Sequence, residues 1–351
     1  MSSPTDTAWI TEYVLPLFGL GGATVAPLGQ GLINQTFLVT TGDRQVVLQR
    51  LSPIFDARIH RNIEAVTAQL ATVGIPTPRL VSTTSGGLWA DLAEGGIWRA
   101  QTFLTGASFD KPTSESQVHS ASILVGRFHQ ALVDLPHAFE GLRQGVHDTP
   151  KHLRALATAG HDHEGHPLRA DVTALAREIF ANAGALPPLP DLPPMIGHGD
   201  LKLNNVIFAG PTAPEAEQAQ ALIDLDTVGP QALAFELGDA WRSWCNQSGE
   251  DATEAVVDLD LFEASLDGYA VGVGRALSAG ERKAMLLGPE WVALELSARF
   301  AADALHETYF GWNPKKYASR GEHNLVRARG QFAVHKAFLA TRDIRAKVLG
   351  I

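Results

Sequence analysis

The sequence contains a single cysteine, Cys245, among its 351 residues. One thiol cannot form an intramolecular disulfide or a cysteine-rich metal site, so disulfide scaffolds and zinc modules of that kind are excluded. A reducing compartment is the simpler expectation for such a chain. At 45% hydrophobic residues the chain is not disordered, and its length suits two domains or two lobes better than one small core.

Positive charge is scarce, and the first basic residue is Arg44. A secretory signal needs a basic start and a mitochondrial transit peptide needs arginines, so we expect neither. No apolar run approaches the roughly 20 residues that a membrane span requires. The formal charge of −10 is unlike the basic footprint of a nucleic-acid or membrane-surface protein. We therefore expect a cytoplasmic, soluble protein with neither kind of partner.

Strand-like sequence fills the first third of the chain. Residues 24–50 hold β-rich runs around a glycine segment and a Thr-Gly-Asp-Arg turn at 41–44, which predicts a hairpin. Residues 59–73 have the apolar spacing of a helix, and 97–104 resemble a further strand.

Helical patterns dominate after Thr105 and Gly106. They cover residues 115–134, most of 150–183, and about 289–305. This segregation predicts an α+β fold with two lobes, a β-rich one over 1–104 and a helix-rich one over 105–351.

The strongest motif lies within residues 196–229. His198-Gly199-Asp200 is followed by Asn205, and Asp224 ends a second apolar segment. If 206–208 and 221–225 pair as a hairpin, Asp200, Asn205 and Asp224 converge. Asp and Asn near strand ends also form ordinary turns. The combined spacing H-G-D-x-x-x-x-N and I-D instead favours phosphoryl transfer, because Mg²⁺ takes such hard oxygen ligands.

These motifs resemble the phosphotransferase family that includes aminoglycoside phosphotransferases, choline kinases and homoserine kinases. The similarity is greatest to the N-acetylhexosamine 1-kinases. It spans about Gly29 to Ala328 and includes GLINQTF at 31–37, VLQRL at 47–51, KLNNV at 202–206, IDLDTV at 223–228, GDA at 238–240 with Arg242, and EHNL at 322–325 with Arg327 and Ala328.

The resemblance implies a protein-kinase-like bilobal fold and the cofactors ATP and Mg²⁺. Asp200 would orient and deprotonate the attacking hydroxyl, and Asn205 and Asp224 would hold Mg²⁺. Lys202 lies inside the similar segment. Asp226 shares a strand face with Asp224 and is equally consistent with support of the metal site or with a turn.

Gly29 and Gly31 flank Gln30 between two strand-like runs. Glycines there allow backbone N–H groups to approach phosphates, although an ordinary hairpin turn has the same pattern. We assign Gly29, Gly31 and Asn34 to the nucleotide. Gln101 and Phe103 belong to the expected connection between the lobes, where the adenine edge would bond the backbone.

A lysine is missing where kinase-like enzymes carry one on the third strand, because the first lysine is Lys111. Gln49 stands at that place and Arg50 follows it. Either Gln49 faces the phosphates without a charge, which we prefer, or a bulge turns Arg50 inward. Glu64 is the candidate helical glutamate, with a solvated helix face as the alternative.

The acceptor is expected over Asp200 in the helical lobe. The resemblance points to Arg299 and Tyr309, and Trp312 lies close by in the sequence; alternatively the rings are core and Arg299 is a surface cation. We interpret His198 as a backbone anchor and Asp239 with Arg242 as a structural brace. The histidines at 161–166 suit a solvated loop better than a metal site.

Taken together, the motifs predict Mg·ATP-dependent phosphorylation of the anomeric hydroxyl of an N-acetylhexosamine. The alternatives are a kinase of an amino alcohol or aminoglycoside and a nucleotide-binding scaffold without catalysis. A cationic acceptor would require extra carboxylates over Asp200. The segment from Arg299 to Asn313 instead supplies a cation and rings, which favours a neutral sugar.

Overall fold

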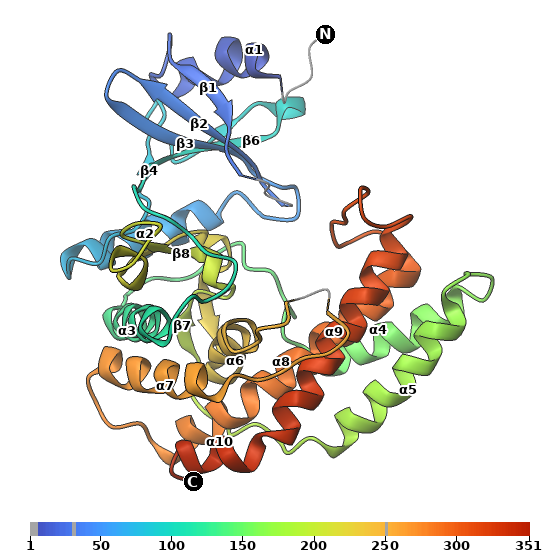
Figure 1. Ribbon diagram of the computed structural model, residues 1–351. Coiled ribbons are helices and arrows are strands. Elements are labelled where there is room, and N and C mark those ends of the chain that lie inside the picture. Colours follow the sequence, from blue (N-terminus) through green and yellow to red (C-terminus); the bar gives the residue numbers. More distant parts are fainter. Residues whose placement is uncertain (1–5, 30–32, 250–251) are drawn as a thin grey trace.

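The computed structural model describes residues 6–29, 33–249 and 252–351. An antiparallel sheet forms one end of the molecule, and most helices pack together at the other end (Figure 1). We call the described residues after the last strand of this sheet the helical part. The predicted α+β architecture with two lobes is confirmed. The boundary between residues 104 and 105 stays a prediction.

The sheet has six strands in the order β1-β2-β3-β6-β4, and β5 pairs with β6. Strands β2 and β3 form the expected hairpin, with Thr41 opposite Arg44. The strands are β1 (Thr24–Pro27), β2 (Gln35–Thr41), β3 (Arg44–Arg50), β4 (Leu80–Val81), β5 (Ala90–Asp91) and β6 (Ile97–Thr102).

One face of the sheet packs against the start of the chain. The segment that begins with α1 (Thr7–Trp9) buries its apolar side chains against Leu48, Trp98 and Ala100. Because strand residues alternate between faces, Gln49 and Arg99 lie on the opposite face, where they are register partners. That second face is directed toward the helical part.

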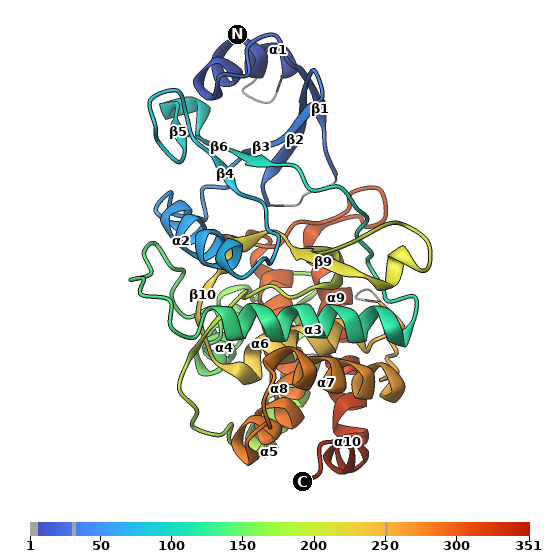
Figure 2. The ribbon, with the colours of Figure 1, turned by 90° about the vertical axis from the view of Figure 1, so that its left-hand side faces the viewer.

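Helix α2 (Ile59–Thr72) lies between the sheet and the helical part (Figures 1 and 2). Its apolar stripe, predicted from the sequence, is buried in the same core as α3 (Glu115–Ala131). Helix α2 also packs against the turn Leu225–Thr227. It therefore carries side chains to the junction between the two parts.

A single connection leaves β6 and is fixed to the helical part almost at once. Ala107 forms an isolated antiparallel bridge with Phe208. Gly106 has φ 149°, and a Cβ there would lie 2.3 Å from the Phe208 carbonyl oxygen. Only glycine fits this approach.

The helical part is built around α8 (Ala279–His306). This helix begins ten residues earlier than predicted, because Ser278 and Glu281 form a capping box and Pro289 is accommodated inside the buried helix. The remaining helices are α4 (Thr149–Asp162), α5 (Arg169–Ala185), α6 (Leu233–Trp244), α7 (Leu259–Val273), α9 (Arg320–Ala340) and α10 (Arg342–Val348). Among the described residues no helix is long and apolar enough to span a bilayer.

Candidate active site

Two short antiparallel strands carry the main motif, as the sequence predicted. Strand β8 (Val206–Phe208) pairs with β9 (Ala219–Leu222), with Val206 opposite Leu222. The Ile223 amide donates to the Asn205 carbonyl at 2.9 Å. This bond places Asp224 directly beside the Asn205 turn.

Asp200 and Asn205 are linked by their own hydrogen bonds. The Asn205 Nδ2 group donates to the Asp200 carbonyl at 2.8 Å and to its Oδ2 at 3.3 Å. Lys202 Nζ lies 3.1 Å from Asp200 Oδ1. Since the amide nitrogen of Asn205 is used in this way, its Oδ1 is the atom that could bind a cation.

Asp224 follows β9 with left-handed backbone angles, φ 61° and ψ 57°. Its side chain is exposed to water, although many protein atoms lie close to its carboxylate. This surrounding protein and the charges of Asp226 and Asp200 raise the pKa of Asp224 to about 7. Three carboxylates therefore gather here, and a divalent cation would favour the ionised form.

The loop that carries Asp200 is held by a buried carboxylate that the sequence analysis missed. Glu236 on α6 accepts from the His198 amide at 2.7 Å and the Gly199 amide at 2.9 Å, and it contacts His129 Nε2 at 3.1 Å. Burial opposes the charge, but bonds and charges from His129 and His198 keep the pKa of Glu236 below its usual range. The sequence signal was a glutamate in the first turn of an apolar helix.

His198 makes the backbone contact expected of it. Its Nε2 lies 2.8 Å from the Ile223 carbonyl oxygen, and the ring is fully buried. The Thr227 hydroxyl donates to the His198 carbonyl at 2.8 Å. The segments that carry Asp200 and Asp224 are thus tied together from both sides.

A buried cation does face this cluster, and it is Arg99 rather than Arg50. Arg99 on β6 pairs with Asp226 Oδ1, and its Nε donates to Gln49 Oε1 at 2.9 Å. Arg50 instead donates to the Gly95 carbonyl. No bulge therefore turns Arg50 toward the cluster, and contact of Gln49 with phosphates stays a prediction. A charged residue in the middle of an apolar strand was the signal for Arg99.

Asn34 also reaches this cluster. Its Nδ2 donates to Asp226 Oδ2 at 2.6 Å. Asp226 is therefore a bridging carboxylate, bonded to Arg99 of β6 and to the residue just before β2, and buried at 6% exposure. Its support of a metal site stays a prediction.

Glu64 is not brought to this cluster. It pairs with Arg79 at 3.3 Å, and both side chains are more than a third exposed. One turn earlier on α2, His60 is buried, and its Nε2 has no partner within the described residues. Burial and the nearby charge of Arg99 lower the pKa of His60 to about 4, so its ring is neutral at pH 7.

The remaining predicted nucleotide residues are Gly29, Gly31, Gln101 and Phe103. Gly29 has φ 73° and is exposed, whereas Gly31 lies outside the described residues. Gln101 sits opposite Val47 and Leu80, and Phe103 follows the strand end, half-buried.

A cavity of about 410 Å³ opens beside Gly199 and Asp226. The loop 141–147 forms one wall, and residues 229–232 with Phe235 form another. His147 stacks on Phe235 at 4.5 Å and bonds the buried Glu295 at 2.9 Å, which fixes that wall. Nothing in our sequence analysis singled out the 141–147 loop.

The predicted acceptor residues gather next to this loop. Arg143 Nη2 donates to the Tyr309 hydroxyl at 2.6 Å, and Arg299 lies 6.0 Å from the Tyr309 ring. The segment that carries Tyr309 is held by Asp303, which accepts hydrogen bonds from the amides of residues 308–310. Trp312 is half-buried. Among the described residues, no hydrogen bond connects it to the Asp200 cluster.

Asp239 is paired with Arg242, whose Nη2 donates to Asp239 Oδ1 at 2.6 Å. Although burial favours the neutral acid, the charges of Arg242 and Lys202 hold the pKa of Asp239 below its usual range. The brace predicted within α6 is present, and it acts electrostatically on the lysine beside Asp200.

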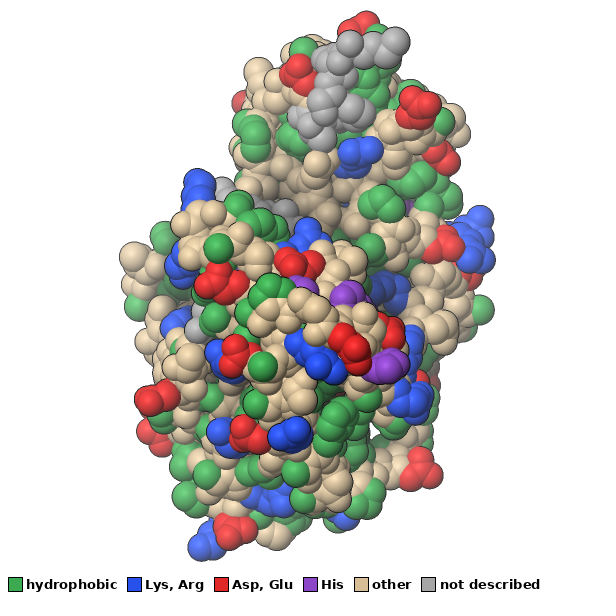
Figure 3. Space-filling model, turned by 90° about the vertical axis from the view of Figure 1, so that its right-hand side faces the viewer, with side chains coloured by type: hydrophobic (Ala, Val, Ile, Leu, Met, Phe, Trp, Pro, Cys, Tyr) green, Lys and Arg blue, Asp and Glu red, His purple; other side chains and the backbone are tan. Residues whose placement is uncertain are grey.

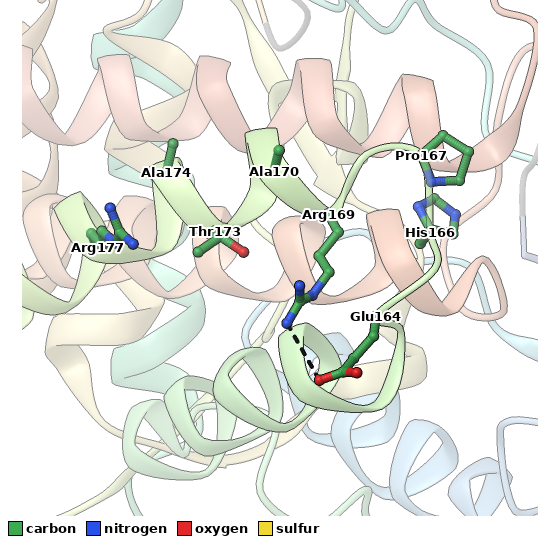
Figure 4. Close-up of a pocket in the computed structure, with 8 residues that line it drawn as sticks. All are labelled: Glu164, His166, Pro167, Arg169, Ala170, Thr173, Ala174 and Arg177. Carbon is green, nitrogen blue, oxygen red and sulfur yellow. Dashed lines mark ion pairs between the residues drawn. The ribbon is translucent and has the colours of Figure 1, made fainter.

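The histidine-rich segment contacts the end of α8 rather than the Asp200 cluster. His163 bonds His306 at 3.0 Å and His166 contacts Glu307 at 3.3 Å, and histidines lie among charges of both signs on the face in Figure 3. Over the described ranges there is no group of three or more His, Cys, Asp or Glu residues arranged for a metal. The hollow beside Arg169 on α5, about 460 Å³, is lined by residues between 164 and 177, and Asp200 is not among them (Figure 4).

Comparison with known proteins agrees with this architecture. The model of the phosphotransferase enzyme family matches residues 24–272. A spectinomycin phosphotransferase, solved with ADP and spectinomycin, has a TM-score of 0.61 at 12% identity, over 95% of this chain and 100% of its own.

Two further solved structures show the same likeness. A microcompartment-associated aminopropanol kinase has a TM-score of 0.61 at 17% identity, covering 92% and 94% of the two chains. A choline/ethanolamine kinase family protein from Mesorhizobium loti has 0.58 at 18%, covering 99% and 98%. At these identities the likeness is one of fold, and it confirms the kinase-like fold predicted from the sequence.

Proposed function

The chain belongs to the phosphotransferase enzyme family, and from that membership we propose that it transfers the γ-phosphate of ATP to a hydroxyl of a neutral sugar. The acceptor of choice is an N-acetylhexosamine, phosphorylated at its anomeric hydroxyl. The observation that carries the proposal is the convergence of Asp200, Asn205 and Asp224 beside a cavity of about 410 Å³.

Asn205 and Asp224 present the oxygen atoms that would hold Mg²⁺, and they suit it because that ion keeps few protein ligands. When bound, the metal supplies neutralisation of phosphate charge. Asp200 accepts the proton of the acceptor hydroxyl, a role worth roughly 10²–10⁴-fold in rate. Gly29 and Asn34 would border the phosphates, and Gln101 and Phe103 would border the adenine; Gly31, predicted for the same role, lies outside the described residues.

The lining of the cavity supports a neutral acceptor. Asp226 is the one carboxylate among its lining residues, and that group is already bonded to Arg99 and Asn34. Arg143 adds a cation to the wall, with Arg299 behind the same tyrosine ring. A cationic acceptor would meet repulsion there, whereas sugar hydroxyls and ring faces find donors and aromatic partners.

An acceptor panel tests the proposal. We would incubate the protein with ATP and Mg²⁺ and with N-acetylglucosamine, N-acetylgalactosamine, choline, ethanolamine or an aminoglycoside, and follow sugar 1-phosphate by ³¹P NMR. Turnover of an N-acetylhexosamine that is lost in Asp200→Asn is the expected result. Turnover of only the amino compounds would replace the acceptor, and nucleotide binding without any transfer would indicate a scaffold.

A further inference from the structure

Arg99 is held between the sheet and the turn that carries Asp224. Its side chain is 1% exposed, Nε donates to Gln49 Oε1, and Nη1 pairs with Asp226 Oδ1. Gln49 Nε2 in turn donates to Thr36 Oγ1 at 3.0 Å. Three neighbouring strands therefore fix the orientation of this guanidinium.

The carboxylate of Asp226 receives a second connection on its other oxygen. Asn34 Nδ2 donates to Asp226 Oδ2 at 2.6 Å, and the Ser52 amide donates to Asn34 Oδ1 at 2.9 Å. The segment just after the glycines and the strand β6 thus meet on one side chain. That side chain stands two residues after Asp224.

The charges around Asp224 come from several elements. Asp226 and Asp200 raise its pKa, while Arg99 and His198 lower it. Lys202 pairs with Asp200. His60 on α2 is neutral at pH 7 and so does not offset the charge of Asp226. The cation that offsets this charge is Arg99.

We infer that Arg99 is a positioning residue, which takes the place of the missing strand lysine by holding the Asp224–Asp226 turn and the Asn34 segment against the sheet. It acts through Asp226 rather than by contact with phosphate, because Asp226 and Gln49 engage its guanidinium. This inference rests on the proposed function, since it takes Asp224 to be a metal ligand.

The test compares Arg99→Met, Arg99→Lys, the double variant Arg99→Met/Asp226→Asn and the matched control Arg50→Met. We would measure kcat, KM for ATP and the half-saturating Mg²⁺ concentration from pH 6 to 9, and the thermal midpoint. A parallel calorimetric titration with Mg·ADP needs no acceptor.

Arg99→Met leaves Asp226 uncompensated beside Asp224. With the turn held against the sheet through Asn34 alone, the half-saturating Mg²⁺ concentration should rise several-fold at each pH and kcat should fall, whereas KM for ATP should change less. The double variant removes the uncompensated carboxylate and should recover part of that loss. Arg99→Lys should keep the half-saturating Mg²⁺ concentration of the wild type and lose part of kcat, and Arg50→Met should match the wild type.

Three results would overturn the inference. Arg99→Met could lower only the thermal midpoint, which would make the pair structural, or raise only KM for ATP, which would mean direct phosphate contact. The third is a double variant that recovers none of the Mg²⁺ affinity lost in Arg99→Met. A wild type that binds Mg·ADP but transfers to no acceptor refutes the proposed transfer alone, because the calorimetric comparison still reports on Arg99. A wild type that binds no Mg·ADP refutes both.

Discussion

Removal of the Glu236 carboxylate should loosen the loop that carries Asp200. In Glu236→Ala the His198 amide, the Gly199 amide and His129 Nε2 lose the acceptor that they now reach at 2.7, 2.9 and 3.1 Å. His198 and His129 are buried, so their unsatisfied donors keep the full desolvation cost, whereas the half-buried Gly199 amide borders the cavity and can reach water.

The magnitude follows from the two buried donors. At about 1–3 kcal/mol for each buried unsatisfied group, the loss is about 2–6 kcal/mol. We expect the lower end, because the vacated space can admit water that bridges some donors. With an unfolding entropy of about 2.1 cal/mol/K per residue, 351 residues give about 0.7 kcal/mol/K, so a loss of about 3 kcal/mol lowers Tm by about 4 °C.

Differential scanning calorimetry at pH 7 measures this shift. The matched control is Glu64→Ala, which removes an exposed ion pair worth about 0–1 kcal/mol and should move Tm by about 1 °C or less. Because the pKa of Glu236 lies below its ordinary 4.5, its contribution is full above that pH and is lost as the pH falls through the lower folded value. The gap between Glu236→Ala and wild type should therefore narrow in acid. If Glu236→Ala melts within 1 °C of the wild type at pH 7, Glu236 does not hold the loop that carries Asp200.

Three further results are expected. Since protonated Asp224 cannot bind a cation and its pKa is about 7, the half-saturating Mg²⁺ concentration of the wild type should fall between pH 6 and pH 8; a flat profile would contradict the ligand assignment. Gly199→Ala places a Cβ 2.8 Å from the Thr227 carbonyl at φ 80°, so kcat should fall and stability should drop by more than about 1 kcal/mol by chemical denaturation, and normal values for both would argue against the strained approach. Arg143→Met should raise the acceptor KM several-fold at unchanged ATP KM, and an unchanged acceptor KM would remove Arg143 from the acceptor wall.

The main motif could be read from the sequence because its geometry is local. Asp200, Asn205 and Asp224 are brought together by one short hairpin, whose strands follow from their apolar runs. The backbone anchoring by His198 follows from the same hairpin. Strand pairing and helix periodicity fixed most elements for the same reason, and the start of α8 was missed because a buried proline was taken for a helix start.

Residues that depend on how distant segments stack could not be read in this way. Arg99 meets Asp226 across 127 positions of chain, and Arg143 meets Tyr309 across 166. No spacing rule links them, because each contact requires the sheet or a loop to settle on the helical part. Glu64 illustrates the same limit, since helix periodicity left its partner open and the fold placed Arg79 there.

The bridge between Ala107 and Phe208 limits where the molecule can bend. Since Ala107 pairs with β8 and Gly106 lies against the Phe208 carbonyl, the connection that leaves β6 can bend only in the few residues between Thr102 and Gly106. The contacts of Asp226 with Asn34 and Arg99 connect the sheet to the helical part at a second place. A bulky ligand that enters between the two parts would break the Asp226 contacts, whereas the bridge between Ala107 and Phe208 would stay intact.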